Sequence, residues 1–146
     1  MIGADVPAHL VPFKGKGEVR VRVRELERRE EEIAVQMRHT VESFTASFRP
    51  PRPMHLVVHG QGGYRHLRWR VGRSGAARQS FVELVSSDVG RHLLGKLPIS
   101  LREVLLEFER VRLALNLVSS VSQHELRRLR EYLAKLEALQ RQESRS

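Results

Sequence analysis

The sequence predicts a mainly α-helical fold with a small β part (α+β), in which two long helices pack as an antiparallel hairpin around a β-hairpin. Three observations support this prediction. Apolar residues recur at intervals of three and four in both end segments, prolines close the first of these segments, and two alternating segments flank a glycine-rich turn between them. At 146 residues, the chain is predicted to be a single domain, residues 1–146, with a sizeable core.

Residues 1–17 contain prolines and glycines without periodicity, which predicts an irregular lead. An apolar stripe at helical spacing then predicts an amphipathic helix over residues 18–48, and RPPRP (49–53) ends it. The stripe consists of Val19, Val23, Leu26, Ile33, Met37, Val41, Phe44 and Phe48.

The start of this segment leaves an alternative open. If GEVRVRVREL (17–26) formed a strand, Arg20, Arg22 and Arg24 would share one face, as in ribbon-type DNA-binding proteins. The helical stripe favours the helix, and the three arginines remain an alternative nucleic-acid-binding set.

The middle of the chain predicts a β-hairpin over residues 54–71. MHLVVH (54–59) and YRHLRWRV (64–71) flank GQGG (60–63), whose glycines permit a tight turn. Closing His59 against Tyr64 pairs Leu56 with Leu67. In this register one face of the hairpin is apolar and the other is basic and aromatic.

Residues 72–98 are predicted to hold a loop and a short strand or helix, with a strand favoured at SFVELV (80–85) and a helical turn or two at 89–97. GRHLLGKL (90–97) approaches a phosphate-binding loop motif but lacks the final Ser or Thr that would hold Mg²⁺, so nucleotide hydrolysis is disfavoured.

Residues 99–140 predict a long helix, followed by a frayed tail at 141–146. The prediction rests on an apolar seam at positions 101, 104, 108, 111, 115, 118, 122, 125, 129, 132, 136 and 139. Because the seam keeps its phase across Ser119–Ser122, one continuous helix is favoured over two. The seam suits packing within the chain, a homodimer or a partner protein.

Charge is concentrated in the middle of the chain. The sequence has 26 Lys and Arg against 17 Asp and Glu, and residues 51–98 hold eight of the basic side chains but only two acidic ones. A basic centre between nearly neutral flanks is typical of a surface that binds phosphates. The predicted DNA contacts are Arg65, Arg68 and Arg70 to phosphates, Tyr64 and His66 as auxiliary contacts, and Arg73 and Arg78 extending the patch.

The same composition argues against several other classes of protein. The chain has no cysteine and only two aspartates, so neither a thiolate nucleophile nor a Ser-His-Asp arrangement is supported. His55, His59 and His66 could share one sheet face, but the neighbouring arginines disfavour a zinc ion. We therefore expect no enzymatic activity, cofactor, metal or small-molecule substrate. No apolar run is long enough to span a membrane and no signal peptide is recognisable, so a cytoplasmic location is expected.

Three short motifs suggest a family. PFKGKG (12–17), LRWR (67–70) and ERVRLALNL (109–117) resemble a family of unknown function carried on bacterial integrating conjugative elements, some members of which bear the label integrase regulator. The resemblance extends from about Val11 to Leu139 and offers no active site to carry over. It implies an accessory protein of a mobile genetic element in a bacterial cytoplasm.

Two hypotheses follow. The first is a non-enzymatic accessory or regulatory protein that binds DNA through the basic hairpin face. The alternative is a helical adaptor that binds another protein through the 99–139 seam, with the basic face only solvated.

Overall fold

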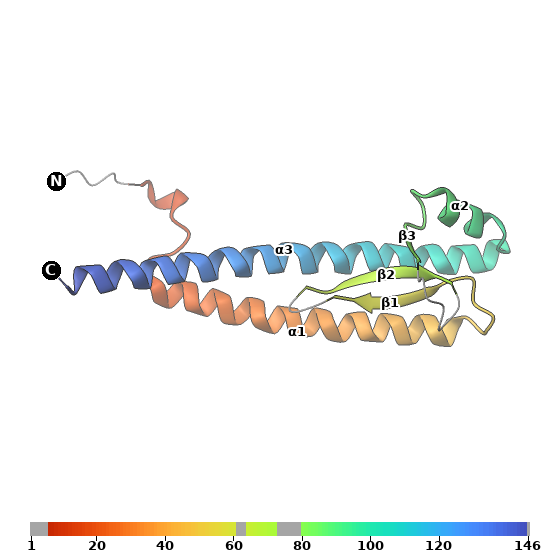
Figure 1. Cartoon of the computed structure of the whole chain (residues 1–146), viewed down its shortest axis with the longest axis horizontal. Helices are drawn as coiled ribbons and strands as arrows, with labels where there is room; N and C mark the ends of the chain where they lie inside the picture. The colour runs from red at the N-terminus through yellow and green to blue at the C-terminus, as the bar shows by residue number, and fades with distance from the viewer. Residues whose placement is uncertain (1–5, 61–63, 73–79, 146) are drawn as a thin grey trace.

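The computed structural model describes residues 6–60, 64–72 and 80–145, and it confirms the mainly helical fold with a small sheet (Figure 1). Two long antiparallel helices run side by side, and a three-stranded antiparallel sheet lies along the half of them farther from the chain termini (Figure 1). The elements in chain order are a short 3-10 helix η1 (Ala8–Leu10), α1 (Lys16–Ser47), β1 (His55–His59), β2 (His66–Val71), β3 (Ser80–Val82), α2 (Asp88–Gly95) and α3 (Ile99–Glu143).

Helix α1 confirms the helix predicted for residues 18–48, and it begins two residues earlier. Its buried residues include Leu26, Ile33 and Phe44, which recur at helical spacing on one face. The strand alternative for residues 17–26 is wrong, because these residues form the first turns of α1. Arg20, Arg22 and Arg24 therefore do not line one face of a strand.

Helix α3 is a single helix that runs through Ser119–Ser122 without a break, as the phase of the seam predicted. It also continues to Glu143, so the tail predicted to fray from residue 141 is helical for three more residues. Near the termini α3 packs on α1, where Val19 and Leu26 meet Leu126 and Leu129. None of the helices within the described ranges is both long and apolar enough to cross a membrane.

The buried face of α3 differs from the predicted seam in the half that lies beside the sheet. Val104, Val111 and Val118 belong to the seam, but they are 39, 41 and 43 % exposed. The buried residues of this half are instead Leu105, Glu109, Arg112 and Ser119, three of which are polar or charged. Phe108 and Leu115 of the predicted seam do pack against the core. The prediction was wrong for the three valines, because it followed apolar residues, whereas the sheet requires polar partners.

Those polar partners complete the edge of β2. Strand β3 is only three residues long and pairs with residues 69–71 of β2, which leaves the preceding part of that edge without a strand. Asn116 fills this place, because its amide accepts from the Leu67 backbone N–H at 2.8 Å and donates to the Leu67 carbonyl at 2.9 Å. Ser119 donates to the Arg65 carbonyl at 3.1 Å. We call Arg112, Asn116 and Ser119 the edge clamp, since Arg112 also donates to the Leu67 carbonyl.

The hairpin is present, but its predicted register is wrong by two residues. His59 lies opposite His66 rather than Tyr64, and Leu56 lies opposite Trp69. In the observed register β2 begins only at His66, and the preceding residue, Arg65, accepts from Ser119 of α3 through its carbonyl. Side chains alternate with a period of two, so a shift of two residues leaves the basic face and the apolar face unchanged.

The segment 72–98 contains both the short strand and the short helix that its sequence predicted. Strand β3 covers Ser80–Val82, which confirms the favoured strand in a shorter form, and α2 follows at Asp88–Gly95. The hydroxyl of Ser87 caps α2 by accepting from the Gly90 N–H at 2.9 Å. Gly90 and Gly95, the two glycines of the segment GRHLLGKL (90–97) that approaches a phosphate-binding loop motif, thus lie within a helix and not in a loop.

The core lies between the sheet and the two long helices. Leu56, Leu67 and Trp69 point inward from β1 and β2 and are at most 3 % exposed. The ring of Phe44 on α1 meets Trp69 edge to face, with 5.3 Å between ring centroids. This packing fixes which face of the sheet remains open.

Candidate nucleic-acid interface

The open face of the sheet carries the basic side chains. Along β1 and β2, residues alternate between the core and this face, as expected for strands with one side packed. We define the open face by His55, Val57 and His59 of β1, His66, Arg68 and Arg70 of β2, and Phe81 of β3. The register brings these residues from three strands onto one surface.

Phe81 organises one part of the open face. The guanidinium carbon of Arg68 lies 4.0 Å from the centroid of the Phe81 ring, which is the geometry of a cation–π contact. The imidazole of His59 meets the same ring edge to face, with 5.0 Å between centroids. The Phe81 ring of β3 therefore holds the Arg68 guanidinium of β2 by a cation–π contact, and both side chains lie on the open face.

Arg70 lies in the middle strand, between His55 of β1 and Phe81 of β3. Its Nε is buried and has no hydrogen-bond partner among the described residues. Within the described ranges, neither Arg68 nor Arg70 has a carboxylate at ion-pair distance, whereas Arg22, Arg112 and Arg130 on the helices pair with glutamates. The positive charge of the open face is thus not neutralised by described acidic side chains.

The histidines respond to this positive charge. Partial burial lowers the pKa of His55, and the cations Arg70 and Arg52 lower it further. Burial also lowers the pKa of His66, with additional contributions from Arg68 and His59. No carboxylate acts in the opposite direction on either imidazole. Both imidazoles are therefore harder to protonate than a free histidine, and the negative charge of a bound anion would act against this shift of their pKa.

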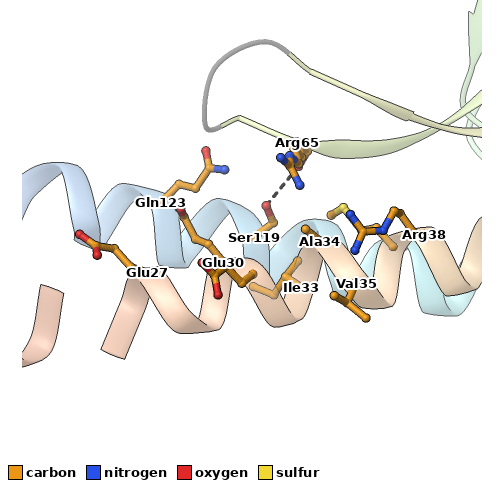
Figure 2. A pocket seen from close by; sticks show the side chains of 11 residues that line it. Glu27, Glu30, Ile33, Ala34, Val35, Arg38, Arg65, Ser119 and Gln123 are labelled. Atoms are coloured by element: carbon orange, nitrogen blue, oxygen red, sulfur yellow. Dashed lines mark hydrogen bonds between the residues drawn. The ribbon is translucent and has the colours of Figure 1, made fainter. Parts of the chain in front are cut away.

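Arg65 does not join Arg68 and Arg70. It precedes β2 and lines a cavity of about 610 Å³ between α1 and α3, together with Glu30, Arg38 and Ser119. Figure 2 shows Arg65 beside Ser119 and above the two helices, with Glu30 reaching up from α1. Burial raises the pKa of Glu30, although the positive charges of Arg130 and Arg65 act against this rise. Arg65 is thus directed toward acidic side chains and away from the open face.

The other predicted contacts fall in three places. Tyr64 lies just before β2, is 52 % exposed, and its ring meets that of His66 with 4.4 Å between centroids, so it borders the open face. Arg73 and Arg78 lie outside the described residues. Arg20 pairs with Glu137 at 3.3 Å across the helices and Arg22 with Glu125 at 2.6 Å, whereas Arg24 is exposed on α1.

Sequence reasoning missed Phe81 as a site residue. The short stretch SFV (80–82) suggested a strand, but its register depended on an eight-residue connection from β2 that fixes no pairing. Three histidines also share the open face, yet no group of three metal-ligating side chains in the described part of the chain is arranged to hold a metal ion.

Comparison of the chain with models of protein families, with curated proteins and with solved structures found no match. Function is therefore inferred from the residues of the open face themselves.

Proposed function

We propose that the protein binds DNA through the open face of its sheet and acts as a non-enzymatic accessory or regulatory protein. One observation carries the proposal: the exposed Arg68 and the partly buried Arg70 lie with imidazoles and an aromatic ring on one face of the sheet, and neither has a carboxylate partner among the described residues. Guanidinium groups on such a surface suit phosphate oxygens, and rings suit bases or sugars. The sequence motifs that resemble proteins of integrating conjugative elements support a role on a bacterial mobile element.

The test measures how binding depends on salt. Fluorescence anisotropy of a labelled short duplex, titrated with the protein at several salt concentrations, gives the slope of log K against log salt. In the variant Arg68→Gln/Arg70→Gln, two lost phosphate contacts are expected to flatten this slope by about 1.8. Circular dichroism confirms that the fold is intact.

A matched control removes two positive charges from another part of the molecule. Arg110 and Arg128 lie on α3, with side chains 73 and 66 % exposed. Arg110→Gln/Arg128→Gln is expected to leave the slope close to that of the unmodified protein, because these side chains lie away from the open face. An equal change in both double variants, or in neither, would rule out the open face as the DNA-binding surface.

One observation favours a second candidate function, in which α3 mediates protein–protein contact. Val104, Val111 and Val118 are partly exposed and are spaced seven residues apart, so they form one stripe along the helix. The partner in this case is a second copy of the chain, whose α3 presents the same spacing. Sedimentation should then show a dimer that Val111→Asp converts to a monomer, and a monomer at all concentrations would exclude it.

A further inference from the structure

The shape of the sheet restricts which nucleic acid it can accommodate. A two-stranded ribbon can enter the major groove of duplex DNA, which is about 12 Å wide. Here β2 is covered on both edges, because β1 lies on one side and β3 lies on the other. Where β3 stops, the edge clamp brings α3 alongside β2 (Figure 1). Within the described residues, the sheet therefore presents a broad face backed by helices and not a free two-stranded ribbon.

Aromatic rings and cations share this face. Phe81 carries the guanidinium of Arg68 and the imidazole of His59, while Tyr64 and His66 form a second ring pair next to the hairpin end. Bases stack on aromatic side chains only when they are unpaired and free to leave their own stack, whereas the bases of a duplex expose edges alone. Rings on a flat basic surface consequently serve a single strand better than a duplex.

Resting on the proposed function, we infer that the open face prefers single-stranded nucleic acid to duplex. Phe81 and Tyr64 stack on unpaired bases, and Arg68 and Arg70 contact phosphates of the same strand. This assignment differs from a two-stranded ribbon in the major groove, which is one way in which β-strands bind duplex DNA. The chemistry of an unpaired base over a ring is shared by DNA and RNA, so the test includes both.

The test compares three labelled probes: oligothymidine of about 15 nucleotides, oligouridine of the same length and a duplex of the same length. The single strands are expected to bind at least about 10-fold more tightly than the duplex. Phe81→Leu should weaken single-strand binding about 10-fold and leave the salt slope unchanged, because stacking involves no counterion release. Phe81→Tyr keeps the ring and should restore the affinity.

Controls keep this inference separate from the proposed function. Arg68→Gln should flatten the single-strand slope by about 0.7. The only tryptophan, Trp69, is fully buried, so unchanged emission shows that each variant is folded. Equal or tighter binding to the duplex, with the arginine effect intact, would overturn the single-strand preference and leave the proposed function standing.

The remaining outcomes are also informative. Binding to none of the three probes would overturn both the preference and the proposed function. Tight binding to oligouridine alone would support the single-strand preference and replace DNA by RNA. An affinity of Phe81→Leu equal to that of the unmodified protein would overturn the stacking role of this ring.

Discussion

Arg112 and Glu109 form a charged pair inside the core, where each side chain is about 95 % buried. Arg112 donates from Nε and Nη2 to the two oxygens of Glu109, at 2.9 and 2.6 Å, and from Nη2 to Glu83 at 2.8 Å. Glu109 also accepts from the indole N–H of Trp69. Burial lowers the pKa of Arg112, but its hydrogen bonds and the two carboxylates outweigh this, so the pKa is raised.

Removing one partner of this pair is expected to be costly. Arg112→Met leaves the Glu109 carboxylate buried without its counter-charge, so we expect a loss of about 3–5 kcal/mol in the free energy of unfolding. Urea unfolding followed by Trp69 fluorescence measures it. The exposed neighbour Arg110→Met serves as a control and should cost less than about 0.5 kcal/mol. Equal losses in the two variants would contradict a structural role for the buried pair.

At the scale of elements, the helices and strands were predictable because their signals are local. The apolar stripe of α1 and the prolines after it fixed that helix to within two residues, and the phase across Ser119–Ser122 predicted one continuous α3. The faces of the hairpin also followed from alternation alone, since a shift of two residues preserves them.

What could not be predicted depends on contacts between elements. The carbonyl of Arg65, for example, accepts a hydrogen bond from Ser119, which lies 54 residues away in sequence, and no local pattern predicts that contact or the register of the hairpin. The buried face of α3 was missed because polar residues such as Asn116 and Arg112 normally face solvent. Here they face the sheet, because β3 is too short to pair with all of β2 and they form hydrogen bonds to the unpaired Leu67 carbonyl. Of the candidate site, Arg68, Arg70 and His66 lie on one face by strand periodicity, whereas Phe81 required the third strand.

The edge clamp predicts a localised effect in β2. Asn116→Leu removes the acceptor of the Leu67 N–H and one of the two donors to the Leu67 carbonyl, which keeps its hydrogen bond from Arg112. The partly buried N–H that is left without a hydrogen bond costs about 1–3 kcal/mol. Hydrogen exchange should show loss of protection at the Leu67 amide, with protection retained at Trp69, which pairs with β3. Ala114→Leu, at an exposed position of the same helix, should leave both amides protected. Protection of Leu67 that survives Asn116→Leu would exclude the clamp.

At the scale of the whole molecule, the open face is expected to couple protonation to stability and, if it binds nucleic acid as proposed, to binding. The folded-state pKa values of His55 and His66 lie below the ordinary value of 6.5, so the unfolded chain takes up protons first as pH falls. The stability contribution of these histidines is therefore complete above about pH 6.5 and declines as pH falls through their lowered pKa values. A bound phosphate acts in the opposite direction, since its negative charge favours the protonated imidazoles.

Nucleic-acid affinity is thus expected to rise over the range in which the histidines' contribution to stability falls. Anisotropy titrations at constant ionic strength should show tighter binding as pH is lowered through about 6.5, by up to about one decade per pH unit for each histidine that takes up a proton. His55→Gln/His66→Gln should flatten this dependence, whereas His39→Gln, at an exposed position on α1, should retain it. An affinity that stays constant or falls over this range would show that the two histidines do not face the bound phosphates. As pH falls, stability should therefore decrease while nucleic-acid affinity increases. If the open face were only solvated, the decrease in stability would remain but affinity would not increase, because no bound phosphate would raise the pKa of the imidazoles.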